Sequence, residues 1–285
     1  MKNKFLDYNR DILEKSNLSL EYKEAKEKEE IRLIDGKEKI HKVKYLEVSD
    51  RIGVQPINLQ SKPILANLCV FNMLDMNIDT MYANAEGKNF KAKYDLIKCN
   101  DNIGIITKAF YRIFKIIRNA MTHSINSIRI EQNNNIIDYT FKGTRFYLEI
   151  SDKSLVELYT ATILLLDCRI SEKRGLKFKE GILSYYYNRI MGRITIKDDI
   201  SSSNDFTQLM YELNPRREIV VNAVYSIEDN KIKIKNAELD NTEIRDFAIT
   251  YNNKCYVIPI EILESNCINI SNLVEWESDN SYLKI

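Results

Sequence analysis

Hydrophobic positions in the middle of the chain recur at three- and four-residue steps, the spacing of one face of an α-helix. The clearest segment runs from about Asn102 to Ser124, and its apolar stripe consists of Ile103, Ile106, Phe110, Ile113, Phe114, Ile117 and Met121. The opposite side is polar and mostly basic, with Lys108, Arg112, Lys115, Asn119 and His123. Arg118 lies at the border between the two sides. The pattern therefore predicts a largely buried helix with one basic face.

Four other segments have helical patterns. They cover about residues 61–76, Asn89–Ile97, Leu155–Ile170 and a stretch that follows Gly181. Ser151 or Asp152 precedes the third of these and is a suitable N-terminal cap. The middle of the chain is thus expected to be a bundle of four to five helices.

Alternating apolar positions predict strands between residues 125 and 150 and again in the last third of the chain. Residues 228–230 (Glu-Asp-Asn) and 252–254 (Asn-Asn-Lys) each lie between two strand-like segments, so each predicts a hairpin turn. The run of residues 201–205 (Ser-Ser-Ser-Asn-Asp) is the best candidate for a linker.

The first 60 residues are the most charged part of the chain. Residues 21–30 carry acidic and basic residues at i,i+4 spacing, which predicts an exposed helix, and Asp35-Gly36 predicts a tight turn between short strands. The expected fold class is α+β, with three parts. These are a charged N-terminal arm (1–60), a helical domain (61–200) with a β insertion (125–150), and a β-rich C-terminal domain (201–285).

Composition limits the classes of function. The 285 residues contain 42 Lys and Arg against 41 Asp and Glu, so any RNA site must be a local patch. Five scattered cysteines, with no C-x-x-C pair and only two histidines, predict neither a disulfide framework nor a zinc site. No metal or cofactor is therefore expected. Because no signal segment or membrane-spanning run is evident, the expected location is the cytoplasm, away from membranes.

The predicted basic helix ends in Arg118-Asn119-Ala120-Met121-Thr122-His123. A histidine can transfer protons near neutral pH, and an arginine can hold a phosphate with its rigid fork of donors. Together they are suited to RNA cleavage without a metal. The alternative interpretation is an ordinary helix C-terminus, where Arg and His interact favourably with the negative end of the helix dipole.

Arg118-Asn119-x-x-x-His123, at the end of the third helix of a bundle, resembles the signature of the HEPN superfamily over about residues 61–190. Members are compact helical bundles, and many are metal-independent ribonucleases. The resemblance implies an endoribonuclease with Arg118, Asn119 and His123 as catalytic residues, leaving 2′,3′-cyclic phosphate and 5′-hydroxyl ends. It also implies a homodimer in which two motifs share one cleft. Lys108, Arg112 and Lys115, on the basic face, are expected to follow the RNA backbone.

The same resemblance implies a toxin or an anti-phage defence protein that cleaves tRNA, rRNA or mRNA. The C-terminal part would then dock an antitoxin or sense a trigger protein. Two alternatives remain open: a catalytically silent HEPN module that binds a nucleotide or a partner, and a structural or regulatory protein whose match is accidental.

Aromatic residues outside the motif carry weaker predictions. The run Tyr185-Tyr186-Tyr187 could stack on bases, but packing in the core is the favoured interpretation. Trp276 is expected to be a packing residue, and Arg216-Arg217 to be exposed for solubility or to extend a basic groove.

Overall fold

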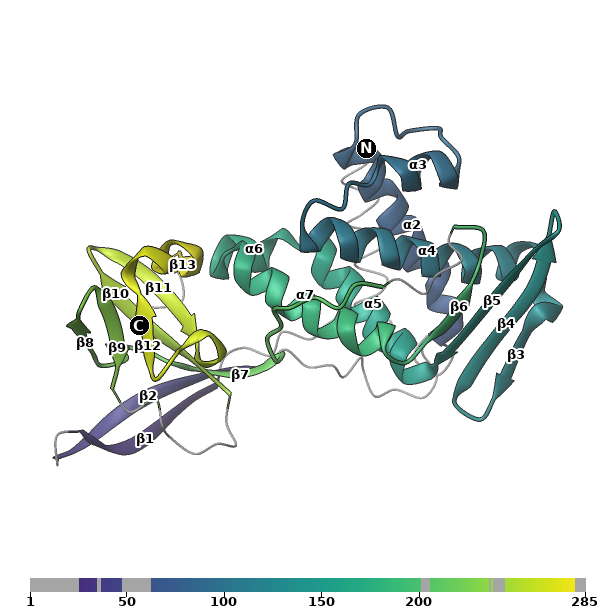
Figure 1. Cartoon of the computed structure of the whole chain (residues 1–285). Coiled ribbons are helices and arrows are strands. Elements are labelled where there is room, and N and C mark those ends of the chain that lie inside the picture. The colour runs from purple at the N-terminus through teal and green to yellow at the C-terminus, as the bar shows by residue number, and fades with distance from the viewer. Residues whose placement is uncertain are drawn as a thin grey trace. The chain divides into compact units, whose positions relative to one another are not determined.

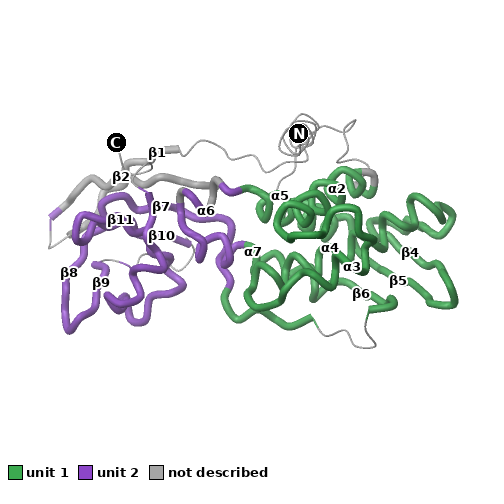
Figure 2. The backbone as a smooth tube through the Cα atoms, turned by 90° about the horizontal axis from the view of Figure 1, so that it is seen from above, with its two compact units in different colours: residues 1–20, 50–167, 183–211 green, residues 21–49, 168–182, 212–285 purple. Residues whose placement is uncertain are grey.

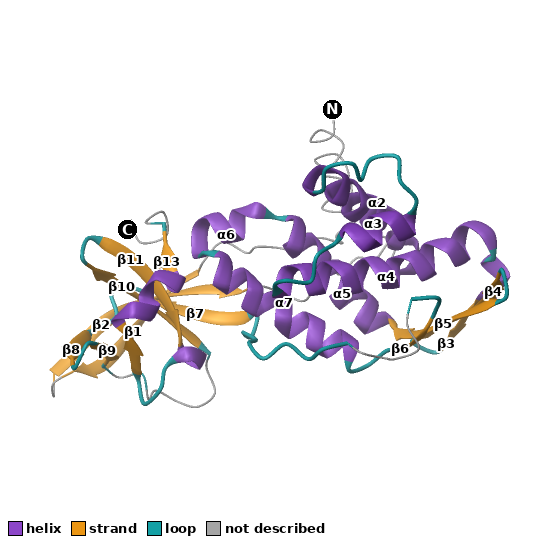
Figure 3. Cartoon of the chain, turned by 45° about the horizontal axis from the view of Figure 1, so that its top comes forward, coloured by secondary structure: helices purple, strands orange, loops and turns teal. Residues whose placement is uncertain are grey.

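The computed structural model describes residues 26–34, 37–47, 63–200, 206–235, 237 and 244–279 (Figure 1). The protein is α+β, as predicted, and helices and strands are distinguished in Figure 3. The chain forms two compact units, which are coloured separately in Figure 2. Unit 1 comprises Met1–Leu20, Asp50–Asp167 and Leu183–Tyr211, and unit 2 comprises Glu21–Ser49, Cys168–Ile182 and Glu212–Ile285.

Helices form the core of unit 1. Helices α2 (Pro63–Met81), α4 (Asn102–His123) and α5 (Asp152–Leu166) pack against one another, and the short α3 (Phe90–Leu96) packs on α4. Helix α7 (Leu176–Met191) begins in unit 2 and ends in unit 1. All of these helices lie where the apolar pattern predicts them, because each buries its apolar positions against the others.

Side-chain caps fix the starts of three helices. Asp101 Oδ1 accepts from the Gly104 N–H at 2.7 Å to start α4, and Ser151 Oγ accepts from the Ser154 N–H at 3.1 Å to start α5. Asn89 caps α3 in the same way. Three predicted boundaries are wrong. Helix α2 continues to Met81, beyond residue 76, and α5 ends at Leu166 instead of Ile170. Helix α7 starts at Leu176 and contains Gly181 in its interior. An interior glycine costs only about 1 kcal/mol.

Unit 1 also contains an antiparallel sheet with the strand order β3-β4-β5-β6. Its strands are β3 (Ile128–Glu131), β4 (Asn134–Phe141), β5 (Thr144–Ser151) and β6 (Thr195–Lys197), and the 3-10 turn η2 (Ile125–Ser127) joins α4 to β3. The first three strands are the predicted insertion. In β5 every second residue is buried, and both β4 and β5 contact α4. The C-terminal end of α4 therefore lies beside this sheet.

Unit 2 contains two sheets and the helix α6 (Cys168–Arg174). The six-stranded sheet has the order β1-β2-β7-β10-β11-β13, and only the β7–β10 pair is parallel. Its strands are β1 (Lys26–Ile34), β2 (Lys37–Glu47), β7 (Arg216–Val220), β10 (Arg245–Tyr251), β11 (Lys254–Pro259) and β13 (Glu277–Ser278). The three-stranded sheet joins β12 (Cys267–Asn269), β9 (Lys231–Ile234) and β8 (Tyr225–Glu228). Two 3-10 helices, η3 (Ile260–Ile262) and η4 (Ile270–Trp276), complete the unit.

Both predicted hairpins of the C-terminal part are confirmed. Asp229 and Asn230 join β8 to β9 with φ of 47° and 61°, and Asn252 and Asn253 join β10 to β11 with φ of 48° and 61°. Two successive left-handed residues match a type I′ turn, which suits the twist of a hairpin and favours Asn and Asp. Trp276 is 3% exposed, which confirms its prediction as a packing residue.

The N-terminal prediction is partly wrong, because the segment from Lys26 onward is a strand rather than an exposed helix. In the pairing of β1 with β2, Glu27 lies opposite Lys44 and Glu29 opposite Lys42. Opposite charges in register stabilise antiparallel pairs, so this charge pattern suits a strand as well as a helix. Since β2 pairs with β7, the predicted separate arm contributes instead to the sheet of unit 2. The predicted turn at residues 35–36 and the linker at 201–205 lie outside the described residues.

A buried ionic cluster joins α6 to the six-stranded sheet within unit 2. The fully buried carboxylate of Asp246 forms ion pairs with Arg174 of α6 and with Arg217 of β7, the latter at 2.7 Å. Arg217 also donates to both carboxylate oxygens of Glu261. Charges removed from water are stable only when they are paired in this way. Arg217 is thus an interior residue, and the sequence interpretation that placed it on the surface is wrong.

Candidate functional site

The residues Arg118, Asn119 and His123 occupy the last turns of α4. The helix ends at His123, because the Ser124 N–H still donates to Ala120 O at 2.9 Å and the chain then turns into η2. His123 is exposed, whereas Arg118 and Asn119 are half-buried. The end of an otherwise buried helix therefore presents an imidazole to solvent.

Arg118 and Asn119 are linked by their side chains. Arg118 Nη1 donates to Asn119 Oδ1 at 3.1 Å, and no ion pair joins Arg118 to a carboxylate of the described residues. Asn119 precedes His123 by one helical turn and lies on the same side of α4. Arg118 and His123 lie roughly 140° apart around the helix axis. Asn119 is therefore placed between the guanidinium and the imidazole.

Tyr139 of β4 lies next to Asn119. Burial raises the pKa of Tyr139 to about 12, and the neighbouring Asn119 side chain acts in the opposite direction. The Tyr139 ring stacks on Phe146 with centroids 5.0 Å apart. The Tyr139 hydroxyl thus remains protonated at neutral pH beside Asn119, an arrangement that the sequence does not predict.

The basic face predicted on α4 is not exposed. Arg112 is 5% exposed and donates to both carboxylate oxygens of Asp198, at 2.6 and 2.8 Å. Lys115 is 9% exposed and pairs with Asp199 at 2.9 Å. The segment after β6 covers this face and supplies both carboxylates. These two cations are already neutralised, so the expectation of a solvent-exposed row for the RNA backbone is wrong for both.

Lys108, the third residue of the predicted row, is half-buried. Its ammonium donates to Ile97 O at 3.2 Å and lies 4.6 Å from the centre of the Tyr94 ring. Its charge is therefore directed at a neighbouring ring and a carbonyl, in contacts within unit 1.

Replacing Asp198 with alanine is expected to lower the free energy of unfolding of unit 1 by about 3 kcal/mol. The Asp198 side chain is fully buried, so its removal leaves the Arg112 guanidinium in the interior without that carboxylate. Denaturant unfolding followed by circular dichroism measures the change. The matched control is Asp138→Ala. It removes the partner of Arg145 from an ion pair that also has two hydrogen bonds, but in which the Arg145 side chain is 57% exposed. An exposed pair contributes less than about 1 kcal/mol, so equal losses in the two variants would contradict the prediction.

A second buried polar cluster lies near Arg118. Lys93 pairs with Asp75 and with Asp79, each at 2.7 Å, and the Tyr111 hydroxyl donates to Asp75. Burial and the Asp75 contact raise the pKa of Tyr111, and Arg118 lies close enough to oppose that rise. Sequence reasoning missed this cluster, although two aspartates one turn apart in an apolar helix are a detectable signal.

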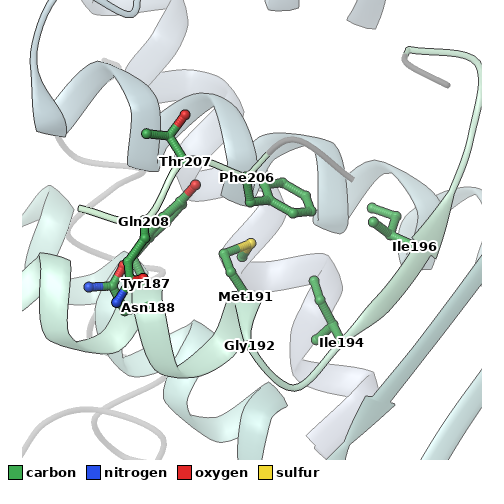
Figure 4. Close-up of a pocket in the computed structure, with 9 residues that line it drawn as sticks. All are labelled: Tyr187, Asn188, Met191, Gly192, Ile194, Ile196, Phe206, Thr207 and Gln208. Atoms are coloured by element: carbon green, nitrogen blue, oxygen red, sulfur yellow. The ribbon is translucent and has the colours of Figure 1, made fainter. Parts of the chain in front are cut away.

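A cavity in unit 1 has a volume of about 350 Å³ (Figure 4). Tyr187, Asn188 and Met191 of α7, Ile196 of β6 and Phe206 contribute to its wall, and none of the described residues that line it is charged. Such a cavity is unsuited to a phosphate. Tyr186 and Tyr187 are each 1% exposed, and Tyr185 is half-buried beside Arg189, so the tyrosine run is mainly core, as favoured from the sequence.

Neither a search for metal ligands nor a comparison with known proteins adds a further site. Among the described residues, no group of three or more His, Cys, Asp or Glu side chains is placed to hold a metal ion. All five cysteines are free thiols. In the part of the chain that the structure describes, no helix has the length and apolar character required to span a bilayer.

Comparison with known proteins gives no match: no family model, no curated protein and no solved structure is similar to the chain.

Proposed function

We propose that the chain is a metal-independent endoribonuclease of the HEPN type, with Arg118, Asn119 and His123 as its catalytic residues. One observation carries the proposal. Arg118 has no carboxylate partner among the described residues, whereas Arg112 and Lys115 on the same helix each have one. A guanidinium with unused donors, five residues before an exposed histidine on the same helix, is suited to hold a phosphate for proton transfer.

The proposed reaction uses the nucleophile that RNA carries. The 2′-oxygen attacks the adjacent phosphorus, the bond from phosphorus to the 5′-oxygen breaks, and a 2′,3′-cyclic phosphate and a 5′-hydroxyl result. A base accepts the 2′-hydroxyl proton and an acid gives a proton to the departing 5′-oxygen. Arg118 donates hydrogen bonds to the phosphate oxygens, where negative charge develops. Asn119, one turn before His123, orients the imidazole.

A second copy of the chain completes the proposed site. The base and the acid act on opposite sides of the phosphorus, so one histidine does not serve both positions. Because Arg118 and His123 point roughly 140° apart on α4, one protomer presents them in different directions. Two motifs facing each other in a homodimer supply both groups, and sedimentation should then give twice the chain mass of 33.4 kDa.

The HEPN resemblance also suggests the setting. We propose that the enzyme cleaves tRNA, rRNA or mRNA in the cytoplasm, as a toxin or in anti-phage defence. An active ribonuclease requires restraint in its own host, and unit 2 is the proposed docking part for an antitoxin or a trigger protein. If the chain is instead a non-catalytic HEPN module, it should bind such partners without cleaving RNA.

Cleavage of an end-labelled single-stranded RNA by the purified chain tests the proposed function. Cleavage is expected to persist in excess EDTA and to leave 5′-hydroxyl ends. Arg118→Ala should lower kcat by about 10²–10³-fold, the cost of removing one preorganised donor group. Arg118→Lys should recover only part of the rate, because an ammonium lacks the two-bond geometry. Arg145→Ala, on an exposed arginine of β5, is the control, and full activity of Arg118→Ala would reject the proposal.

A further inference from the structure

Four aromatic rings from three helices of unit 1 form a stacked row. Tyr111 of α4 lies between Phe71 of α2 and Phe90 of α3, with centroids 5.7 and 4.4 Å apart, and Phe90 stacks on Tyr94 at 5.8 Å. Tyr111 is fully buried, whereas Phe90 and Tyr94 are half-buried. Phe71, at the other end of the row, is half-buried as well, so the row passes through the core at Tyr111 and approaches the surface at Phe90 and Tyr94.

A cavity of about 120 Å³ opens where this row reaches the surface. Phe90 and Tyr94 line it together with the charged residues Lys91, Asp95, Lys115 and Asp199. The Lys115 ammonium lies 4.7 Å from the Phe90 ring centre and 5.1 Å from that of Phe146, and Asp199 holds it at 2.9 Å. The cavity thus combines aromatic rings with both donors and acceptors of hydrogen bonds.

The charges of this cavity favour a nucleobase over a phosphate. Among the described residues, two lysines and two aspartates line it, so their formal charges cancel, whereas a phosphate site needs excess positive charge. A base stacks on an aromatic ring and bonds through its edge, and a carboxylate accepts from its amino group. Lys91 and Asp95 are both exposed at this site and have polar ends available for that edge.

The cavity also lies at a useful distance from the proposed catalytic residues. Lys115 precedes Arg118 by three residues and Asn119 by four, so it is about one helical turn, roughly 5 Å, away along α4. In a double helix the bases are paired and stacked, so turning one outward into a protein pocket costs unpairing energy that a single strand does not require. We infer that this cavity receives an unpaired base beside the scissile phosphate, which makes single-stranded RNA the substrate class. This inference rests on the proposed function.

Binding by the full-length His123→Ala variant tests the inference without cleavage. The probe is a fluorescein-labelled single-stranded RNA of mixed sequence, compared with the same strand in a perfect duplex. Adding Tyr94→Ala should weaken binding of the single strand about tenfold, the usual effect of losing one stacked base. Binding of the duplex should be unchanged. Tyr94→Phe keeps the ring and should bind as tightly as the parent, which separates stacking from the hydroxyl.

The control is Tyr147→Ala, at the position in β5 that follows Phe146 and so points to the other face of the sheet. It should leave the affinity unchanged, and thermal unfolding verifies that each variant is folded. Equal affinity of the Tyr94→Ala variant and its parent for the single strand would overturn the inference. If the chain never cleaves RNA but binds the single strand in a way that depends on Tyr94, the inference stands and the proposed ribonuclease function is rejected. Cleavage that depends on His123 but not on Tyr94 would do the opposite.

Discussion

Replacing His123 with alanine is expected to lower RNA cleavage by about 10²–10⁴-fold, the usual contribution of a positioned acid or base. In a bacterial host the unsubstituted chain should then arrest growth, and the variant should not. His123 is exposed at the end of α4, and exposed substitutions usually change stability by less than about 0.5 kcal/mol. A lost phenotype would thus reflect lost chemistry. Growth curves and sequencing of RNA 5′-hydroxyl ends measure both effects.

The chain offers a matched control for this experiment. His41, on β2 of unit 2, is the only other histidine, and His41→Ala should arrest growth as the unsubstituted chain does. Arrest by the His123→Ala variant, with the same new RNA ends, would remove His123 from the mechanism. It would favour the interpretation in which the Arg118–His123 spacing is accidental.

Local sequence signals predicted the element that carries this site. The apolar stripe from Ile103 to Met121 gave both ends of α4 to within one residue, because the stripe and the Asp101 cap act over one or two turns. The two C-terminal hairpins were equally predictable, since their turns use residues that tolerate positive φ. Each of these features depends only on neighbours in sequence.

Contacts between distant residues were not predictable in the same way. Arg112 pairs with Asp198, which is 86 residues away, and Lys115 pairs with Asp199, which is 84 residues away. Periodicity places a cation on a polar face but does not reveal whether another segment covers that face. The same limitation applies to β2, because it pairs with β7, a strand far away in the sequence. The site was therefore predicted as a motif, and its surroundings were not.

The covered face changes how the proposed RNA site works. With Arg112 and Lys115 already paired to carboxylates, the proposed phosphate binding would fall mainly to Arg118, in line with the nearly neutral net charge of +1. Much of the affinity must then come from contacts other than a long basic row. Stacking of an unpaired base at Tyr94 is such a contact, and it predicts a weaker dependence of binding on salt than is usual for RNA-binding proteins.

Replacing Asp246 with alanine is expected to destabilise unit 2 by roughly 3–5 kcal/mol, the range for breaking a buried ion pair. Asp246 is fully buried and pairs with two arginines, Arg174 and Arg217, whose side chains are 2% and 1% exposed. Its loss leaves both guanidinium groups in the interior with one carboxylate fewer. The free energy of unfolding, measured in urea for the full chain, should fall by more than in Asp246→Asn, which keeps an acceptor.

The control for this last prediction is an ion pair at the surface of the same unit. Glu228→Ala removes the partner of Lys233, and because both side chains are about half exposed, at 57% and 48%, the loss should be below about 1 kcal/mol. Combining Arg174→Met with Asp246→Ala should cost less than the sum of the two single changes, since residues in one network are coupled. Strictly additive losses would mean that Asp246 is held mainly by its strand neighbours in β10. A loss in the double variant that is smaller than the sum of the two single losses would identify the cluster as the contact that holds α6 against the sheet of unit 2.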